Sequence, residues 1–580
     1  MLMFMRGVCS VLFAVMAINI LIFHPLTARA ESDTPTGENR FRLQAGLELP
    51  GTLYAEDMEQ PDSGGSGEAP LPASKEPFGE KPDIVLSNIL QLSLTEVIQT
   101  TIQNNITIAV QEYNSRIQRQ NIINNEAAFD PSVNMELRAQ DDTLPIASAF
   151  ANPPISETEQ QRWKLGLNQR LKFGTEYELF YEGIRDTTNS LFAGLNPQFS
   201  TRFEVNMTQP LLKNFGRDVN ETNIYIARNN LSISQYDFKS QVIDIITDAE
   251  NVYWDLVFSQ EDLKVKQQSV QRARDLEQRV KAQVEVGTMA PLEILQAQSE
   301  VASREESVIN AEKLIQDNED NLKNILNIAF DSEKGTKNIQ PLDAPQYDPE
   351  AKINLDHAIG EALLNRPDYL SKKKELDSRN IQVEFNKNQV YPTLDLVASY
   401  GLNGITGDAQ AVSLGGAPRV SQFGGDFGRG FGRAGSADFD SWSAGLVFSY
   451  PLGNRAAESQ LTSAKLEVAK LLLDIKDLEK TIIIEVREAV RKLETDIKRV
   501  QAARVARRLA EETLSAELKK FEVGLSTSFQ VLEFQTDLAE EQSKELLAII
   551  DFNKSRINLR RVIATTLDHH KIQLAAEQNP

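Results

Sequence analysis

The chain has 580 residues, with 61 Lys and Arg against 83 Asp and Glu, and a formal net charge of −22 at pH 7. This acidic balance argues against a nucleic-acid partner, because binding to phosphates needs an excess of cations. After the first thirty residues no run of 18 apolar residues occurs, which argues against a transmembrane helix.

Residues 1–30 predict an export signal. Arg6 precedes an apolar run that ends in Ala28-Arg29-Ala30, the small-residue pattern of a cleavage site. The alternative, a membrane-anchor helix, is disfavoured because the run is short. The only cysteine, Cys9, lies early in this run, so we expect the mature protein to have no disulfide, no thiol chemistry and no lipid anchor. Export without a transmembrane helix leaves the periplasm, the outer membrane or the exterior.

Composition and an internal duplication divide the rest of the chain. Residues 31–88 are rich in Pro, Gly, Ser and acidic residues and predict a flexible leader. Two structural repeats of the order helix, strands, helix follow, the first over 89–330 and the second over 351–567. We expect a linker at 331–350 between them and a polar tail at 568–580.

The duplication rests on landmarks that recur in the same order. Three pairs match: Asn104 with Asn365, Pro131 with Pro392, and Pro210 with Pro451. The offset is 261 residues for the first two pairs and 241 for the third, so the strand region is expected to be longer in the first copy.

Alternation of apolar and polar residues predicts strands over about 131–209 and about 391–450. We expect two main strands in each copy. A further alternating pair at 163–183, around the stretch KFGT, predicts an extra hairpin in the first copy, whose place the sequence leaves open. The alternation suits a barrel wall with lipid outside and water inside, and it also suits the edge of a soluble β-sandwich.

Two very long helices are the other main feature. No proline and only one glycine, Gly453, interrupt the chain between Pro451 and Gly524, and an almost equal stretch runs from Pro210 to Gly287. Apolar residues recur every seven positions, as in a coiled coil: Leu461, Val468, Ile475, Ile482 and Ala489. About 70 residues at 1.5 Å each predict helices of about 100 Å.

Both long helices end in the same way. The stretch VEVGTMAPLEILQAQSEVA at 284–302 matches FEVGLSTSFQVLEFQTDLA at 521–539. A glycine in such a position ends a helix, so each stretch predicts the tip of a helical hairpin. The candidate tip residues are Val286, Gly287, Thr288, Val523, Gly524 and Leu525.

Motifs for catalysis or cofactor binding are weak. The four histidines have no metal-ligand spacing, and no nucleophile or nucleotide-binding loop appears, so we expect no enzyme activity, no metal and no cofactor. The stretch GFGRAG from Gly430 to Gly435 fits a dinucleotide fingerprint, but it lies in a glycine-rich run that leads into a predicted strand. We therefore predict that it is a mobile surface loop between strands.

Together, these features give the chain a resemblance to the TolC-like outer-membrane efflux channels over residues 89–567. The resemblance rests on the duplication, on Pro131 and Pro392 entering the strands, on TQPLL and SYPLG leaving them, and on EVGT and EVGL at the helix turns. It implies a mainly α protein with a membrane β-barrel, built as a homotrimer with twelve strands. The long helices would form a second, α-helical barrel in the periplasm. Four strands in one chain are too few to close a membrane barrel alone, which independently requires several copies.

The resemblance also implies a function. Such proteins are the outer-membrane exit ducts of tripartite efflux or type I secretion systems, and they contact outer-membrane lipid, a periplasmic adaptor and an inner-membrane pump. Their hairpin tips dock the adaptor and close the pore. The alternative is a soluble periplasmic coiled-coil adaptor or structural protein. The sequence names neither the exported small molecule or polypeptide nor the class of pump.

Candidate gate residues follow each tip. In the family, carboxylates at the positions of Gln530 and Glu533 ring the entrance and select cations; this chain keeps only the second of them. Glu293 lies six residues past the first tip glycine. An arginine of the family's closed-gate network is replaced here by Ser526.

Overall fold

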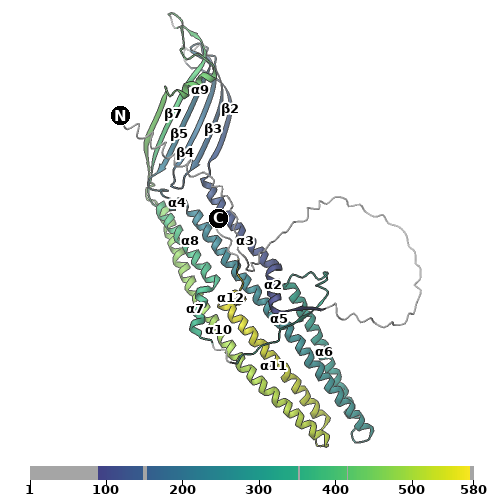
Figure 1. The fold of residues 1–580 in the computed structure, drawn as a ribbon. Coiled ribbons are helices and arrows are strands. Elements are labelled where there is room, and N and C mark those ends of the chain that lie inside the picture. Colours follow the sequence, from purple (N-terminus) through teal and green to yellow (C-terminus); the bar gives the residue numbers. More distant parts are fainter. Residues whose placement is uncertain (1–88, 148–152, 350–352, 414–415, 575–580) are drawn as a thin grey trace, which may run out of the picture. The chain divides into compact units, whose positions relative to one another are not determined.

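The computed structural model combines helices with one main sheet (Figure 1). The predicted mixture of long helices and strands is confirmed. The expected export signal and leader lie outside the residues that the structure describes, which are 89–147, 153–349, 353–413 and 416–574.

The first repeat contains four helices of more than ten residues and four strands of the main sheet. Its elements are β1 (Ile89–Leu92), α2 (Leu94–Asn104), α3 (Ile106–Glu126), the 3₁₀ turn η1 (Ala127–Phe129), β2 (Ser132–Pro145), β3 (Ile155–Arg170), β4 (Glu176–Thr188), β5 (Leu195–Pro210), α4 (Arg217–Asn220), α5 (Thr222–Glu285) and α6 (Leu292–Ile325). The expected linker contains β6 (Asn338–Pro341), which pairs in parallel with β1.

The second repeat has the same order of long elements but only two strands in the main sheet. Its elements are α7 (Leu355–Asn365), α8 (Pro367–Gln389), β7 (Thr393–Ala409), β8 (Ala411–Val412), β9 (Arg419–Val420), α9 (Phe427–Gly435), β10 (Asp440–Ser449), α10 (Arg455–Glu522), α11 (Ser528–Val562) and α12 (Thr566–His569). The expected polar tail begins within α12.

Matched positions of the two repeats are buried alike. Val97 and Thr101 are the fully buried positions of α2, and Ala358 and Ala362 take the same two places in α7, 261 residues later. The four side chains differ in size and polarity. The helices therefore keep one packing face through the duplication, while the residues on that face have changed.

A break between two helices recurs at the same place in each repeat. Asn105 ends α2 and caps α3, and its side chain accepts hydrogen bonds from the first turn of α3. In the second repeat Arg366 stands between α7 and α8, and Pro367 opens α8, where its missing N–H costs nothing. After each break a second helix, α3 or α8, leads to the first strand of its repeat in the main sheet.

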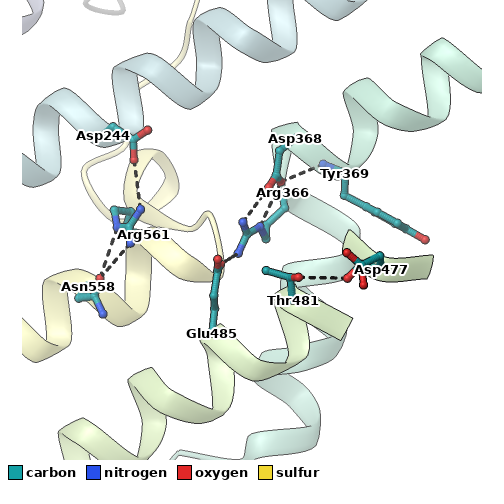
Figure 2. A network of polar contacts seen from close by, with 9 residues as sticks. All are labelled: Asp244, Arg366, Asp368, Tyr369, Asp477, Thr481, Glu485, Asn558 and Arg561. Carbon is teal, nitrogen blue, oxygen red and sulfur yellow. Dashed lines mark hydrogen bonds and ion pairs between the residues drawn. The ribbon is translucent and has the colours of Figure 1, made fainter. Parts of the chain in front are cut away.

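A network of charges fixes the second break (Figure 2). Arg366 is largely buried, bonds Asp368 at 2.7 Å and pairs with Glu485 of α10. Burial opposes the charge, but these two carboxylates outweigh it and raise the pKa of Arg366. Next to it, the hydroxyl of Tyr369 donates to Glu479 at 2.6 Å, and this bond raises the pKa of Tyr369 to about 12. The network ties α8 to the middle of the longest helix.

The main sheet has six antiparallel strands in the order β10-β7-β5-β4-β3-β2. The extra hairpin is longer than the predicted 163–183 and forms β3 and β4, in the same sheet as the other strands. The expectation of two main strands in the first copy is therefore corrected to four. Alternation in β3 and β4 continues in register with the neighbouring strands, so the hairpin joins the sheet.

The loop of the extra hairpin is bound to the beginning of α5. Lys172 in that loop pairs with Glu221 at 3.0 Å, and Gly216 N–H donates to the carbonyl oxygen of Phe173. Glu221 is 3% exposed and also pairs with Arg217. Burial disfavours its charge, but hydrogen bonds from Arg217, Lys172 and Tyr225 outweigh burial and lower the pKa of Glu221 to about 2.

The two faces of the sheet differ in polarity. Paired residues of adjacent antiparallel strands point to the same face, so the register assigns every side chain. One face, called here the polar face, carries the ion pairs Arg162–Glu182, Lys164–Glu178 and Arg202–Glu204. The other, called here the apolar face, carries Val133, Met135, Leu137, Leu165, Leu167, Leu179, Tyr181, Phe203, Val205, Tyr400, Leu402, Trp442, Leu446 and Phe448.

The glycine-rich stretch after β9 is a helix, which corrects the prediction of a mobile loop. Asp426 caps α9 by accepting a hydrogen bond from Arg429 N–H at 3.0 Å. Gly430 and Ala434 are buried against the sheet. Four glycines disfavour a helix of nine residues in water, so contact with the sheet supplies the stability that local propensity lacks.

The helical cores are shared between the repeats. α5 has 64 residues and α10 has 68, and their second halves pack with α6 and α11 in one cluster of buried side chains. A second cluster joins α7, α8, α10 and α11, and a third joins α2, α5, α6, β6 and α11. Among the described residues, no helix is both long and apolar enough to cross a membrane.

Candidate functional site

The two hairpin tips end their first helix with the same backbone turn. Gly287 and Gly524 have φ of 80° and 75°, in the region that favours glycine. At the first tip Gly287 N–H donates to Val284 and Thr288 N–H to Gln283. At the second, Gly524 and Leu525 make the corresponding bonds to Phe521 and Lys520, at 3.0 and 2.8 Å. Each tip is thus a glycine-terminated Schellman motif.

Both tips expose apolar side chains. Val286 is 75% exposed, Val523 is 70% and Leu525 is 78%. The helix starts that follow carry more: Leu292, Leu295 and Phe529 are each about 60% exposed. A Cβ added at either tip glycine would meet no atom within 4 Å. The tips are therefore open, apolar surfaces whose glycines leave the backbone accessible.

A polar contact joins the two tips. The hydroxyl of Ser528, the first residue of α11 and fully buried, donates to the carboxylate of Glu293 in the first turn of α6. Thr527 caps α11 by accepting from Gln530 N–H. The predicted gate residue Glu293 is thus held against the other hairpin. Its partner Ser528 is one that the sequence interpretation did not select.

Arg304 makes the most extensive link between the hairpins. Its side chain is 8% exposed, and its guanidinium donates to the backbone oxygens of Ser269 at 3.1 Å and Leu532 at 2.9 Å. It also donates to the side chains of Gln535 and Thr536 and pairs with Glu300. One side chain of α6 therefore binds both α5 and α11.

The remaining predicted gate residues are more open. Gln530 is exposed and accepts a hydrogen bond from Ser526 at 3.1 Å. Ser526 also donates to Glu517 at 2.6 Å. Hydrogen bonds from Lys520 and then Ser526 lower the pKa of Glu517. Glu533 points to solvent on the exposed side of α11, without an ion pair among the residues described. The structure therefore joins Gln530 and Ser526 but leaves Glu533 apart from Glu293.

Within the part of the chain that the structure describes, no group of three or more His, Cys, Asp or Glu side chains could hold a metal ion.

A model of one family matches the chain over residues 181–327 and 358–565, more than half of its length. That family is described as the outer membrane efflux proteins. The two matched segments contain both long hairpins and both tips. The chain belongs to the outer membrane efflux protein family.

Solved channels share the fold of this family member at low sequence identity. The outer-membrane channel OprN matches with a TM-score of 0.58 and 13% identity, over 81% of this chain and 89% of that one. The CmeC outer membrane channel of Campylobacter jejuni matches with a TM-score of 0.57 and 13% identity, over 84% of this chain and 90% of that one. The outer membrane protein VceC of Vibrio cholerae matches with a TM-score of 0.56 and 14% identity, over 81% of this chain and 95% of that one. A search of curated proteins finds no match.

The family match leaves out the residues before Tyr181, which include β2 and β3. The extra hairpin therefore lies at the edge of what the family model describes.

Sequence patterns contained an overlooked signal for Arg304. The buried positions Ala297, Arg304 and Ala311 of α6 are seven residues apart, so an arginine stands where the heptad expects an apolar side chain. A charge in the core phase of a helix predicts a buried partner on a neighbouring helix. No comparable signal identified Ser528, because a serine at a helix start is ordinary.

Proposed function

We propose that this outer membrane efflux protein is the trimeric exit duct of a tripartite efflux or type I secretion system. It would lie in the outer membrane, extend its helices into the periplasm, dock a periplasmic adaptor that couples it to an inner-membrane pump, and release small molecules or polypeptides. The observation that carries the proposal is a six-stranded sheet with two unpaired edges.

The edges of the sheet favour closure between chains. β2 and β10 are long edge strands, and all ten residues of β10 are exposed. Open edges are not tolerated in lipid, and membrane barrels begin at about eight strands. Because the sheet alternates in direction through an even number of strands, β10 of one copy would meet β2 of the next in antiparallel orientation. Three copies would close an eighteen-stranded barrel, not one of twelve strands.

The faces of the sheet suit such a wall. The apolar face carries side chains such as Val133, Trp442 and Phe448, which are 72%, 59% and 66% exposed in the single chain. In lipid this exposure would be favourable. The polar face, with its ion pairs, would line water in the duct.

The hairpin tips suit docking and gating. At 1.5 Å per residue, the 64 residues of α5 place its tip about 95 Å of helix from the sheet. We assign Val286, Gly287, Thr288, Val523, Gly524 and Leu525 to adaptor docking. Glu293 and Gln530 would belong to the closed gate, held by Ser528 and Ser526, and Arg304 would hold the hairpins together. Three copies of Glu533 would attract cations to the entrance.

Light scattering of the purified, signal-cleaved protein in detergent tests the proposal, together with membrane fractionation. We expect a particle of three chains that is recovered with the outer membrane. A stable monomer in the soluble periplasmic fraction would contradict it and favour the coiled-coil adaptor.

A further inference from the structure

The helix α9 packs on the apolar face of the sheet, on aromatic side chains. Phe427 lies against Trp163 and Phe199, with ring centroids 5.7 and 6.0 Å apart. Phe431 meets the edge of Tyr181 at 5.3 Å. Trp163 and Tyr181 also contact each other, at 4.8 Å. The aromatic seat of α9 therefore spans β3, β4 and β5.

Glycines bring the helix close to the neighbouring strands. The hydroxyl of Thr201 in β5 donates to the carbonyl oxygen of Gly430 at 2.9 Å. A Cβ at Gly404 in β7 would lie 2.3 Å from the same oxygen, so no other residue fits there. Trp163, Gly183, Thr201 and Gly404 stand in one row across the sheet by register. The position of α9 along the strands is therefore that of this row.

This row lies at the end of the apolar face that is farther from the helices. On β7 the apolar face runs from Leu394 to Gly404, and ten residues at about 3.3 Å make about 33 Å of strand. A strand tilted by about 40° then spans about 25 Å along the membrane normal, the height of the apolar band of outer-membrane barrels. Beyond the row of Gly404 the same face carries Phe199, which α9 covers through Phe427, and then the polar side chains Gln161, Arg185 and Glu159.

The outward side of α9 is unsuited to hydrocarbon. Gly428, Arg429, Gly432 and Gly435 are exposed, so this side presents helix backbone and one guanidinium. Phe431 is 57% exposed at the flank of the helix. Apolar flank and cationic outer side together match the headgroup level of a membrane, where arginine is attracted to anionic lipid.

We propose that α9 is an interfacial helix on the outside of the barrel, at the headgroup level of the outer leaflet. Phe431 contacts the beginning of the acyl chains and Arg429 faces anionic headgroups. The helix marks the outer boundary of the membrane on the wall and does not enter the duct. This inference rests on the proposed function, since it takes the apolar face as the lipid side.

Quenching of tryptophan by brominated lipids tests the position of α9. The full chain, reconstituted as purified, carries Phe431→Trp with Trp163→Phe, Trp254→Phe and Trp442→Phe. The reference keeps only the native Trp442, two rows below α9 in the middle of the wall. Vesicles contain phosphatidylcholine brominated either near the headgroup or near the end of the acyl chain.

We expect the tryptophan at position 431 to be quenched more by bromine near the headgroup, and Trp442 to be quenched more strongly overall. Quenching of Trp442 without quenching at position 431, or stronger quenching at 431 by deep bromine, would overturn the placement of α9. Absence of quenching at both positions would instead reject the membrane wall of the proposed function. A bimane label on Gly432→Cys, a site with nothing within 4 Å, gives a second reading if Phe431→Trp folds poorly.

The headgroup contact has its own test. In vesicles with added phosphatidylglycerol, Arg429→Glu in the position-431 background should reduce quenching by shallow bromine, because the anionic surface repels the new charge. Arg419→Glu, at an exposed arginine of β9 outside α9, serves as the charge-matched control. Equal quenching in Arg429→Glu and its parent would overturn the role of Arg429.

Discussion

The second helices of the two hairpins, α6 and α11, match residue by residue at an offset of 237, yet their charges are arranged differently. Glu293 of α6 corresponds to Gln530, and Gln296 corresponds to Glu533, so each tip keeps one carboxylate at a different place. Arg304 corresponds to Glu541.

The structure gives these charges different tasks. The α6 residues Glu293 and Arg304 contact the opposite hairpin. In α11, by contrast, Glu533 is exposed, and Glu541 pairs with the nearby Lys544 at 2.8 Å. After duplication, two turns closed by the same glycine motif therefore carry different side chains. Glu293 and Arg304 of α6 hold the hairpins together, whereas α11 leaves Glu533 exposed.

We expect the strongest loss of function when the glycine turn that both tips share is changed. Gly287→Arg with Gly524→Arg should abolish export and adaptor cross-linking, because the bulky charge covers both accessible backbones. The positive φ adds about 1 to 2 kcal/mol of strain per site. Trimer yield and membrane insertion should stay near normal, since the sheet is distant.

The single variants sharpen this result. Equivalent tips predict partial and similar losses for Gly287→Arg and Gly524→Arg. Lost trimers with intact cross-linking in the remaining ones would mean that the glycines serve folding only.

A somewhat smaller effect is expected from changing the charged residues in which α6 and α11 differ. Arg304→Met removes the hydrogen bonds to five partners and leaves the half-buried carboxylate of Glu300 without its cation, which should destabilise the tip by about 2 to 4 kcal/mol. Hydrogen exchange of the α6 and α11 tip amides should accelerate, and single channels should open more often. The matched variant Glu541→Met should change stability by less than about 0.5 kcal/mol. Similar effects of both variants would refute the division of tasks.

A smaller effect concerns the strands, where the repeats differ most. Glu221 anchors the extra hairpin, and its pKa of about 2 lies below the value of about 4.3 expected in the unfolded chain. Its stabilisation is therefore complete above about pH 4.3 and is lost as pH falls toward 2. Glu221→Gln should lower the melting temperature at pH 7. Between pH 5 and pH 3, the melting temperature of this variant should fall by less than that of the parent protein. Asp218→Asn, an exposed neighbour, should behave like the parent.

The smallest effect concerns ion selectivity. Glu533→Gln should lower the cation preference of single channels, and Gln530→Glu should raise it, because a ring of like charges concentrates counter-ions. Glu293→Gln should change the reversal potential less than Glu533→Gln, since Ser528 already holds that carboxylate. Unchanged reversal potentials in both second-tip variants would make Glu533 an ordinary surface charge.

Much of the fold followed from patterns that are local in the sequence. The heptad pattern predicted the long helices, and the glycines predicted the tips at Gly287 and Gly524. The matched prolines predicted the order of the elements. The place of the extra hairpin did not follow, because pairing between strands depends on register with distant partners.

Two further features also escaped prediction, for a related reason. The helix α9 forms on aromatic rings of three strands against its own propensity, which is a tertiary effect. Of the candidate gate, Glu293 and Gln530 were selected by position alone. Arg304 and Ser528 become visible only when α6 and α11 lie side by side.

In the proposed trimer, the sheet edges β2 and β10 of neighbouring copies meet and close a ring of three chains. Disulfide cross-linking tests it directly, because the native cysteine lies in the predicted export signal. One cysteine at Ser443 in β10 is combined in turn with one at Ser132, Asn134 or Glu136 in β2, all on the polar face. Oxidation in isolated membranes should give a ladder that ends at three chains, strongest for one pair. No cross-linked species for any pair, or a ladder that continues beyond three chains, would contradict the claim.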